Sequence, residues 1–156
     1  MKRILIISDS HGINDQMVKV IGHESADLVV HAGDYGWPIN KMKQYFDYFV
    51  DGNNDYDWKK METFVFANLK FVLLHGDEYW SWNENKWYER LKQVGKDQDA
   101  DVVIFGHSHK EYIDADSKPY LINPGSISLP RNDKMHKSYL IMEIDGGKMN
   151  FLIKHI

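Results

Sequence analysis

The sequence predicts an α/β fold in which two mixed β-sheets are covered on their outer faces by helices. Strand-like and helix-like segments alternate through the first half of the chain, an order typical of parallel strands joined by helices. The second half contains mostly paired strand-like runs separated by short turns, which is typical of antiparallel hairpins. About ten strands are expected, and because a single open sheet of that size rarely stays flat, we expect two sheets.

Length and composition favour one globular domain spanning residues 1–156. The net charge of −4 gives no sign of the basic surface that long nucleic acids require. The absence of cysteine excludes disulfides, zinc–thiolate sites and cysteine nucleophiles, and it fits a reducing compartment. The first apolar run ends at Ser8, too early for a signal peptide. No run of about 18 apolar residues indicates a membrane span, so we expect a cytoplasmic protein.

The elements of the first half follow from short apolar runs and their flanking residues. Residues 4–7 form a continuous apolar run, as expected of a buried, central strand. Asn14 is expected to cap a helix with apolar positions at Met17, Val18 and Ile21. Two further strands are expected at 28–30 and 47–50, and a short helix or irregular segment around 39–45.

The second half is expected to contain three hairpins, one further strand and one amphipathic helix. The helix is predicted over 83–94, because Trp87, Leu91 and Val94 recur at helical spacing. The single strand is the apolar run 102–105. The hairpin strands are predicted at 63–66 with 70–74, 111–114 with 120–122, and 138–144 with 149–153.

Side chains that can bind metal ions follow five of the predicted strands. They are Asp9, His11, Asp34, Asn53, His75, His107 and His109. Because sites in α/β sheets gather at the carboxyl ends of strands, we expect these residues to converge. One ion takes three or four protein ligands, so seven predict two ions that share a carboxylate. Mixed nitrogen and oxygen ligands without sulfur favour manganese, iron or zinc over calcium or magnesium. We expect manganese, with iron, zinc or nickel as alternatives.

Each candidate ligand also has a structural interpretation when it is taken alone. Asp9 and His11 fit a helix N-cap with a surface histidine, Asn53 fits a turn, and His75 fits a hydrogen-bonded core histidine. The repetition of strand, turn and ligand favours the metal interpretation for all of them. His31 is expected to be neutral and hydrogen-bonded. The remaining histidines, His23, His136 and His155, are expected to be structural or exposed.

Two features stay open at the level of sequence. Arg131 could bind a phosphate group or pair with a carboxylate that stabilises its loop. The aromatic residues Tyr79, Trp80 and Trp82 could form a wall for base stacking, a dimer face, or packing against the core. Trp87 is expected to pack in the core.

The chain resembles the calcineurin-like metallophosphoesterases in five motifs that occur in order. These are Asp9-x-His11, Gly33-Asp34, Gly52-Asn53, His75-Gly76 and Gly106-His107-x-His109. Its short length and the segment Asn123-Pro124-Gly125-Ser126 resemble the small bacterial and archaeal phosphodiesterase branch. That branch also includes a eukaryotic retromer subunit of the same fold.

The resemblance implies a four-layer α/β/β/α sandwich and a division of the ligands between two metal ions. The first ion would be bound by Asp9, His11, Asp34 and His109. Asp34 would bridge to a second ion bound by Asn53, His75 and His107, which places Asp34, Asn53 and His75 at the catalytic centre. A hydroxide held between the ions would attack phosphorus in line with the leaving alkoxide.

Two positions depart from the pattern of the family. Many relatives have a histidine after the Gly-Asn motif as the acid for the leaving group, and this chain has Asn54 there. Proton donation would then fall to Asp55, to a metal-bound water, or to no group if the leaving group is a good one. Asp77 stands where the small branch often has a histidine, which would change substrate contacts or the surroundings of the metals.

The predicted function is therefore hydrolysis of a small phosphodiester or nucleotide-like substrate by a binuclear metal centre, without membrane association. Whether the chain forms a homo-oligomer stays open. The alternatives are an interaction scaffold that has lost catalysis, and a nuclease or nucleotide hydrolase of the same fold. The complete set of seven ligands favours an enzyme over a scaffold. The negative net charge argues against a long nucleic acid.

Overall fold

The computed structural model describes residues 1–156. The helices are α1 (Asp15–Glu24), α2 (Ile39–Tyr45), the short 3-10 helix η1 (Asp77–Tyr79) and α3 (Glu84–Asp97). The strands are β1 (Lys2–Ile7), β2 (Leu28–His31), β3 (Tyr48–Phe49), β4 (Met61–Phe66), β5 (Leu69–Leu74), β6 (Val102–Ile104), β7 (Glu111–Asp114), β8 (Tyr120–Pro124), β9 (Ser138–Asp145) and β10 (Lys148–His155). None of the helices has the length and apolar character needed to cross a membrane.

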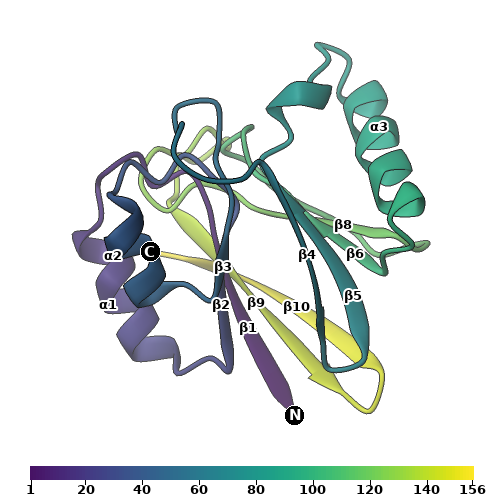
Figure 1. Cartoon of the computed structure of the whole chain (residues 1–156), viewed down its shortest axis with the longest axis horizontal. Helices are drawn as coiled ribbons and strands as arrows, with labels where there is room; N and C mark the ends of the chain where they lie inside the picture. The colour runs from purple at the N-terminus through teal and green to yellow at the C-terminus, as the bar shows by residue number, and fades with distance from the viewer.

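The strands form two mixed five-stranded sheets, with the orders β10-β9-β1-β2-β3 and β4-β5-β6-β8-β7. Helices α1 and α2 cover the outer face of the first sheet, and α3 covers the outer face of the second (Figure 1). Three hydrophobic cores lie between these layers, one between the sheets and one under each helical layer. The predicted α/β/β/α architecture is confirmed.

Strand β1 lies at the centre of its sheet and contributes to two cores. Ile4 and Ile6 belong to the core between the sheets, whereas Leu5 and Ile7 belong to the core under α1 and α2. All four side chains are fully buried. Because successive side chains of a strand point to opposite faces, a strand buried on both faces has a continuous apolar sequence. Strand β5 of the second sheet repeats this arrangement.

The parallel strands of both sheets end on the same side of the molecule. In the first sheet β2 runs parallel to β1 and to β3. In the second sheet β6 runs parallel to β5 and to β8. The loops that follow these strands gather at the end of the sandwich opposite the N-terminus (Figure 1). The predicted metal-binding motifs therefore share one edge.

Two local predictions are corrected by the structure. Asn14 occupies the N-cap position of α1, but its side chain makes no capping hydrogen bond, so the predicted cap is wrong. The third strand is limited to Tyr48–Phe49 rather than 47–50. The Asp47 carboxylate accepts a hydrogen bond from the Val29 N–H (2.8 Å), while the Asp47 N–H donates to the Val29 carbonyl oxygen (2.9 Å).

Helix α3 is longer than predicted and continues through Gly95 to Asp97. The glycine is explained by packing on the second sheet rather than by helix termination. A Cβ at Gly95 would lie 2.6 Å from Val103 Cγ2 and 2.7 Å from Pro119 Cγ. The absence of a side chain therefore lets α3 approach the sheet closely.

The buried carboxylate of Glu24 fastens α1 to the first sheet. Tyr139 Oη donates to it at 2.5 Å, Lys154 Nζ at 3.1 Å and Arg3 Nη2 at 3.2 Å. Burial alone would raise the pKa of Glu24, but the hydrogen bonds from Tyr139 and Lys154 and the charge of Lys154 lower it. The ionised carboxylate is therefore the form that stabilises this contact.

We expect Glu24→Gln to lower the free energy of unfolding at pH 7 by about 1–3 kcal/mol, because hydrogen bonds to a charged group are lost. The pKa of Glu24 is lower in the folded chain than its ordinary value of 4.5. The stabilisation is therefore fully present above that value and is lost as the pH falls through the folded-state pKa. Urea unfolding at pH 7 and pH 3 should show the difference from wild type shrinking at pH 3. An undiminished difference would contradict this account, and Glu89→Gln on the exposed face of α3 is the control.

Candidate metal centre

The loops at the carboxyl ends of the parallel strands enclose a cavity of about 70 Å³. Five of the seven predicted ligands line it. The lining residues are His11, Asp34, Asn53, Asn54, His107, His109 and Arg131. The other two predicted ligands, Asp9 and His75, are buried, and their side chains lie beside the same group of atoms. The structure thus brings all seven residues together.

The Asp9 carboxylate lies at the centre of three imidazole rings. Its Oδ1 is 3.2 Å from His109 Nε2, 3.7 Å from His75 Nε2 and 3.8 Å from His11 Nε2. Its Oδ2 accepts hydrogen bonds from Ser8 Oγ (2.6 Å) and from the His107 N–H (3.1 Å). One oxygen is thus held by the protein, and the other is left facing the histidines.

The Asp34 carboxylate reaches one histidine on each side of the site. Its Oδ2 lies 3.3 Å from His75 Nε2 and 3.6 Å from His11 Nε2. Asn54 holds this carboxylate, with its backbone N–H donating to Oδ1 (2.9 Å) and its side-chain Nδ2 to Oδ2 (3.0 Å). Burial would raise the pKa of Asp34, but His75 and Asn54 outweigh that effect and lower it. Asp34 is therefore ionised.

Hydrogen bonds to carbonyl groups fix how two of the imidazole rings face the site. Nδ1 of His75 lies 2.7 Å from the Ala32 carbonyl oxygen, and Nδ1 of His109 lies 2.6 Å from that of Leu129. A carbonyl oxygen only accepts, so Nδ1 carries the proton in both rings. In the neutral ring the Nε2 lone pair is then available to a metal ion, which is the usual arrangement of metal-binding histidines.

The donor set fits divalent metal ions. The donor atoms of two triads lie within 4.8 Å of one another, namely Asp9, His11 and His109, and Asp9, Asp34 and His75. Asp9 Oδ1 and His75 Nε2 are buried and have no hydrogen-bond partner, so both donor atoms are available to a metal ion. Burial would lower the pKa of His75, but Asp9 and Asp34 raise it to about 9. The two carboxylates thus favour a positive charge between them.

The two triads differ in one respect from the arrangement that the family resemblance implies. Asp9, rather than Asp34, belongs to both triads. Asp34 still contacts both sides, because its Oδ2 lies near His11 as well as His75. Asn53 and His107 line the cavity, and the His107 ring lies 5.2 Å from the His75 ring, measured between centroids.

Left-handed backbone conformations concentrate in the motifs. Five predicted ligands have positive φ, namely Asp9 (56°), His11 (50°), Asp34 (57°), His107 (72°) and His109 (59°). Such conformations cost a non-glycine residue on the order of 1–3 kcal/mol each and persist where the surroundings enforce them. These conformations occur in the loops whose side chains meet at the metal cavity. Backbone strain is thus stored where the sequence places the ligands.

The glycines of the motifs allow the loops to approach one another. A Cβ at Gly52 would overlap the Asp34 side chain and lie 2.5 Å from its backbone nitrogen. A Cβ at Gly33 would lie 2.6 Å from His75 Nδ1, and one at Gly106 would lie 2.7 Å from Asp9 Oδ2. Each glycine therefore leaves the space that a ligand from another strand occupies.

Asp55 does not fit the predicted role of proton donor. Its Oδ2 accepts hydrogen bonds from the N–H groups of Asp34 (2.7 Å) and Gly52 (2.9 Å), and its Oδ1 accepts from Gly36 N–H (3.3 Å). Burial raises the pKa of Asp55, but the carboxylate faces backbone donors and is not among the residues that line the metal cavity. Asp55 instead joins the Asp34 loop to the Gly52 turn.

The segment after β8 fixes the backbone of two motif loops. The hydroxyl groups of Ser126 and Ser128 donate to the Asp9 carbonyl oxygen at 2.7 and 3.0 Å. The Asn123 side chain donates to the Gly106 carbonyl oxygen at 2.9 Å. These serine contacts are formed across more than 100 residues of sequence, so they were not visible as a local pattern.

His31 is a structural histidine, as predicted. Its ring is fully buried, and its Nδ1 accepts a hydrogen bond from the Gly33 N–H (3.0 Å). Its Nε2 therefore carries the proton and donates to Ser10 Oγ (2.9 Å). Burial lowers the pKa of His31 to about 3, which keeps the ring neutral.

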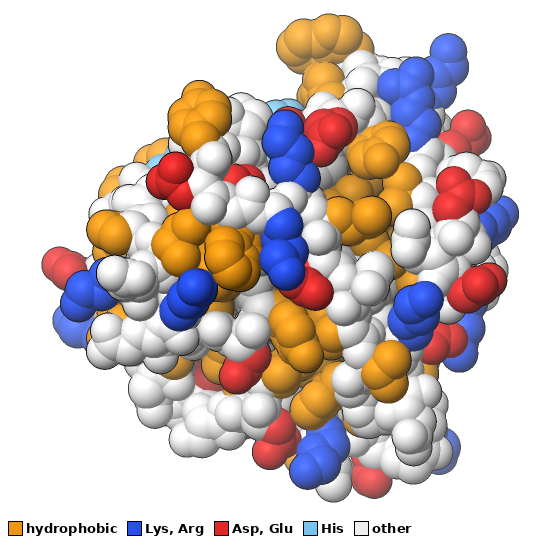
Figure 2. Space-filling model, in the orientation of Figure 1, with side chains coloured by type: hydrophobic (Ala, Val, Ile, Leu, Met, Phe, Trp, Pro, Cys, Tyr) orange, Lys and Arg blue, Asp and Glu red, His pale blue; other side chains and the backbone are white.

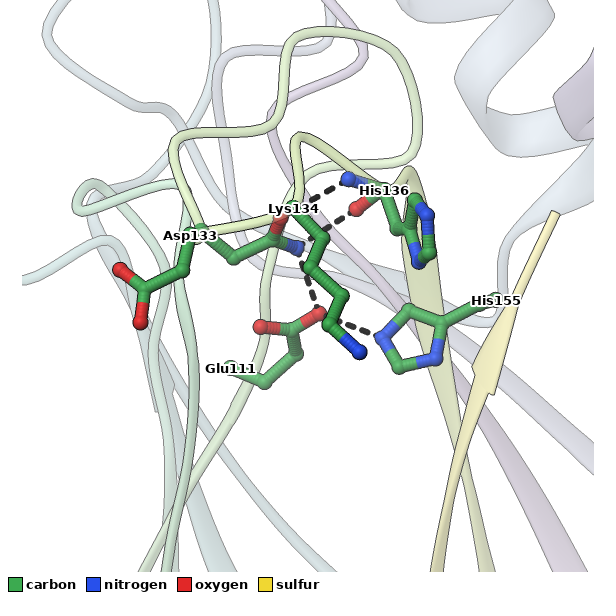
Figure 3. A pocket seen from close by; sticks show the side chains of 6 residues that line it. Glu111, Asp133, Lys134, His136 and His155 are labelled. Carbon is green, nitrogen blue, oxygen red and sulfur yellow. Dashed lines mark hydrogen bonds and ion pairs between the residues drawn. The ribbon is translucent and has the colours of Figure 1, made fainter.

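Hydrogen bonds among the residues that line a second pocket stabilise the loop that carries Arg131 (Figure 3). Glu111 Oε1 accepts hydrogen bonds from Asn132 Nδ2 and from His155 Nε2, both at 2.8 Å. Asn132 Oδ1 also accepts from the His136 N–H (2.8 Å), and the Arg131 N–H donates to the carbonyl oxygen of His109 (3.0 Å). His155 thus has the structural role predicted for it.

Comparison with known proteins agrees with this geometry. The model of the calcineurin-like phosphoesterase superfamily domain matches residues 1–147. A probable metallophosphoesterase of Mycoplasma genitalium is 36% identical over 155 residues, which cover 99% of this chain and 95% of that protein.

Solved structures of the same fold include a predicted phosphoesterase from Streptococcus pneumoniae, with a TM-score of 0.81 and 25% identity over 99% of this chain and 97% of that one. Vps29 from Entamoeba histolytica has a TM-score of 0.75 and 20% identity over 99% of each chain. An archaeal phosphodiesterase has a TM-score of 0.72 and 20% identity over 97% of this chain and 99% of that one. The motifs, the fold and the family match together show that the chain belongs to the calcineurin-like phosphoesterase superfamily.

Proposed function

We propose that the chain is a phosphodiesterase that uses two divalent metal ions, with manganese as the first candidate. The observation that carries this proposal is the pair of buried carboxylates, Asp9 and Asp34, facing the Nε2 atoms of three histidines at 3.2–3.8 Å. A mixed nitrogen and oxygen donor set of this kind suits manganese, iron or zinc. The similarity in fold to an archaeal phosphodiesterase supports a diester as the substrate.

The two ions would be held by overlapping sets of ligands. Asp9, His11, Asp34 and His109 would hold the first ion, and Asp34, Asn53, His75 and His107 would hold the second. When bound, such a pair supplies a water molecule activated at neutral pH and positive charge for the phosphoryl oxygens. The protein contributes the positions of the ligands, through Asn54 on Asp34 and the carbonyl groups on His75 and His109.

Arg131 would bind the substrate phosphate. It lines the metal cavity, and its guanidinium group forms no ion pair with any carboxylate of the chain. The alternative of a structural ion pair within its loop is therefore not realised. A guanidinium group offers paired donors that match phosphate oxygens. The loop contacts of Asn132 and Glu111 hold this residue in place.

We expect Arg131→Ala to raise the KM for phosphodiesters about 10- to 100-fold, because a charge-assisted hydrogen bond worth about 1.5–3 kcal/mol is lost. The KM of Arg131→Lys should lie between those of Arg131→Ala and wild type, since lysine keeps the charge but not the paired donors. Steady-state kinetics at saturating metal measure this effect. Lys19→Ala, on the exposed surface of α1, is the control. An unchanged KM in Arg131→Ala would exclude the proposed contact.

The metal cavity offers no acid for the leaving group beyond the proposed metal ligands. Its lining contains Asn54 at the position where many relatives have a histidine, and Asp55 is engaged with the backbone. Proton donation would then fall to a metal-bound water or to no group, and diesters with acidic leaving groups should react fastest. The direct test is hydrolysis of bis(p-nitrophenyl) phosphate and p-nitrophenyl phosphate by the manganese-loaded chain. Activity on the diester supports the proposal, and inactivity on both esters would refute it.

A non-catalytic scaffold is the second candidate, favoured by the similarity in fold to Vps29. Against it stands the complete ligand set, with orphaned donor atoms at Asp9 and His75. A chain selected only for protein contacts has no need of these buried, strained ligands. The same hydrolysis assay separates the two candidates.

A further inference from the structure

A cleft lined with indole side chains opens beside the metal cavity. It has a volume of about 310 Å³, and its walls include Trp80, Trp82, Glu84, Lys110 and Arg131. We refer to it as the indole cleft. It shares His107 and Arg131 with the metal cavity. If the phosphorus of a diester lies at the metal centre, one of its two ester substituents can therefore reach the cleft.

The two indole side chains of the cleft differ in their surroundings: Trp80 is held by packing, whereas Trp82 is exposed to solvent. The Trp80 ring packs against Trp87 and His107, with centroid distances of 4.8 and 5.1 Å, and Arg90 donates to the Trp80 carbonyl oxygen at 3.0 Å. The Trp82 side chain is 93% exposed and lies 6.0 Å from the Trp80 ring. Hydrophobic side chains project from the surface where the loop between η1 and α3 lies (Figures 1 and 2).

The charged side chains of the indole cleft form no ion pairs with the rest of the chain. Lys110, Arg131 and Glu84 line it, and none of their side chains forms an ion pair within the chain. Two cations suit the negative charge of a phosphate group. A carboxylate accepts hydrogen bonds from the amino groups of a base. Aromatic faces stack on bases of any sequence.

We propose that the indole cleft binds the nucleobase of a small nucleotide phosphodiester whose phosphorus lies at the metal centre. This assignment rests on the proposed phosphodiesterase function and names its substrate class. The base stacks on Trp82, and Lys110 and Arg131 contact the phosphate side of the nucleotide. The net charge of −4 limits the substrate to a nucleotide or a short fragment rather than a long nucleic acid.

Binding of a matched pair of probes tests the cleft without requiring catalysis. Adenosine 5′-monophosphate and ribose 5-phosphate share a sugar and a phosphate and differ in the base. In the metal-loaded chain, the first probe should shift the NMR signal of the Trp82 indole N–H and the second should not. Zinc serves as the diamagnetic ion for this experiment. Equal responses to both probes, or none to either, would overturn the assignment.

Affinities of variants give the size of the effect. Base stacking on an aromatic side chain is worth about 1–3 kcal/mol, which is about 5- to 150-fold in affinity. Trp82→Ala should weaken binding of adenosine 5′-monophosphate by that factor and leave ribose 5-phosphate unchanged, and Trp82→Phe should restore most of the loss. Trp58→Ala, at a pocket beside β3, is the control. Because Trp82 is 93% exposed, its replacement should leave the fold intact.

Kinetics separate failure of this assignment from failure of the proposed function. Thymidine 5′-(p-nitrophenyl) phosphate and methyl p-nitrophenyl phosphate have the same leaving group, and only the first has a base. Trp82→Ala should raise the KM for the nucleoside diester alone. If wild type hydrolyses both esters and the variant matches it on both, the cleft assignment is wrong and the phosphodiesterase function stands. If wild type hydrolyses neither ester, the function is wrong, and the binding experiment still decides the cleft.

Discussion

Asp34→Asn is expected to remove at least one metal ion per chain and to lower kcat/KM on phosphodiesters by more than about 100-fold. Its Oδ2 is the carboxylate oxygen that lies near His75 on one side and His11 on the other. The substitution keeps the size of the side chain but removes its charge, so the expected loss is electrostatic rather than steric. An amide nitrogen in place of Oδ2 would also face the Asn54 donor.

Metal analysis and steady-state kinetics on the same preparation check this result. Asp57→Asn, an exposed carboxylate in the neighbouring loop, is the matched control and should keep both metal and activity. Thermal unfolding of the two metal-free variants shows whether the Asp34 substitution acts through the site or through the fold. Full metal content and full activity in Asp34→Asn would contradict a shared carboxylate.

Gly52→Ala is expected to lower metal affinity as strongly as Asp34→Asn does, although it changes no predicted ligand. The added methyl group would overlap the Asp34 side chain and the Asp34 backbone nitrogen. Relieving such an overlap in a packed region costs about 1–3 kcal/mol. The shift also affects the Gly52 N–H, which donates to Asp55 (2.9 Å) and so helps to hold the Asp34 loop. Metal affinity should fall together with the free energy of unfolding.

Gly22→Ala supplies the contrasting control. Gly22 lies within α1, and a Cβ there would have no heavy atom within 4 Å. Alanine is favoured over glycine in a helix by up to about 1 kcal/mol, so this variant should be slightly more stable than wild type. Urea unfolding of the metal-free chain and titration with metal measure both effects. A Gly52→Ala chain with wild-type stability and metal affinity would rule out the steric account.

The parts of the fold that the sequence predicts well are those set by burial. Strand β1 is buried on both faces, so its apolar run of Ile4–Ile7 is unbroken and was identified directly. Helix α3 was found from the spacing of Trp87 and Leu91, and both residues are buried. The end of α3 was placed at Val94, the last apolar residue of the pattern, whereas the helix continues to Asp97.

The candidate site was predictable where residue type alone carries the chemistry. The seven proposed ligands, from Asp9 to His109, converge because six parallel strands end on one side of the molecule. The supporting contacts were not predictable, because they depend on orientation. Asn54 was interpreted as the absence of an acid, but its amide holds Asp34. Asp55 was one of the candidate proton donors, but it binds backbone N–H groups.

The central claim is that the chain holds two metal ions in one centre. The most direct measurement is a titration of the metal-free chain with Mn²⁺, in which bound metal per chain is counted and the electron paramagnetic resonance spectrum is recorded at saturation. We expect two ions per chain and the spectrum of a spin-coupled pair, as two ions about 3.5–4 Å apart would give. Binding of a single ion, or of two ions without coupling, would contradict the claim.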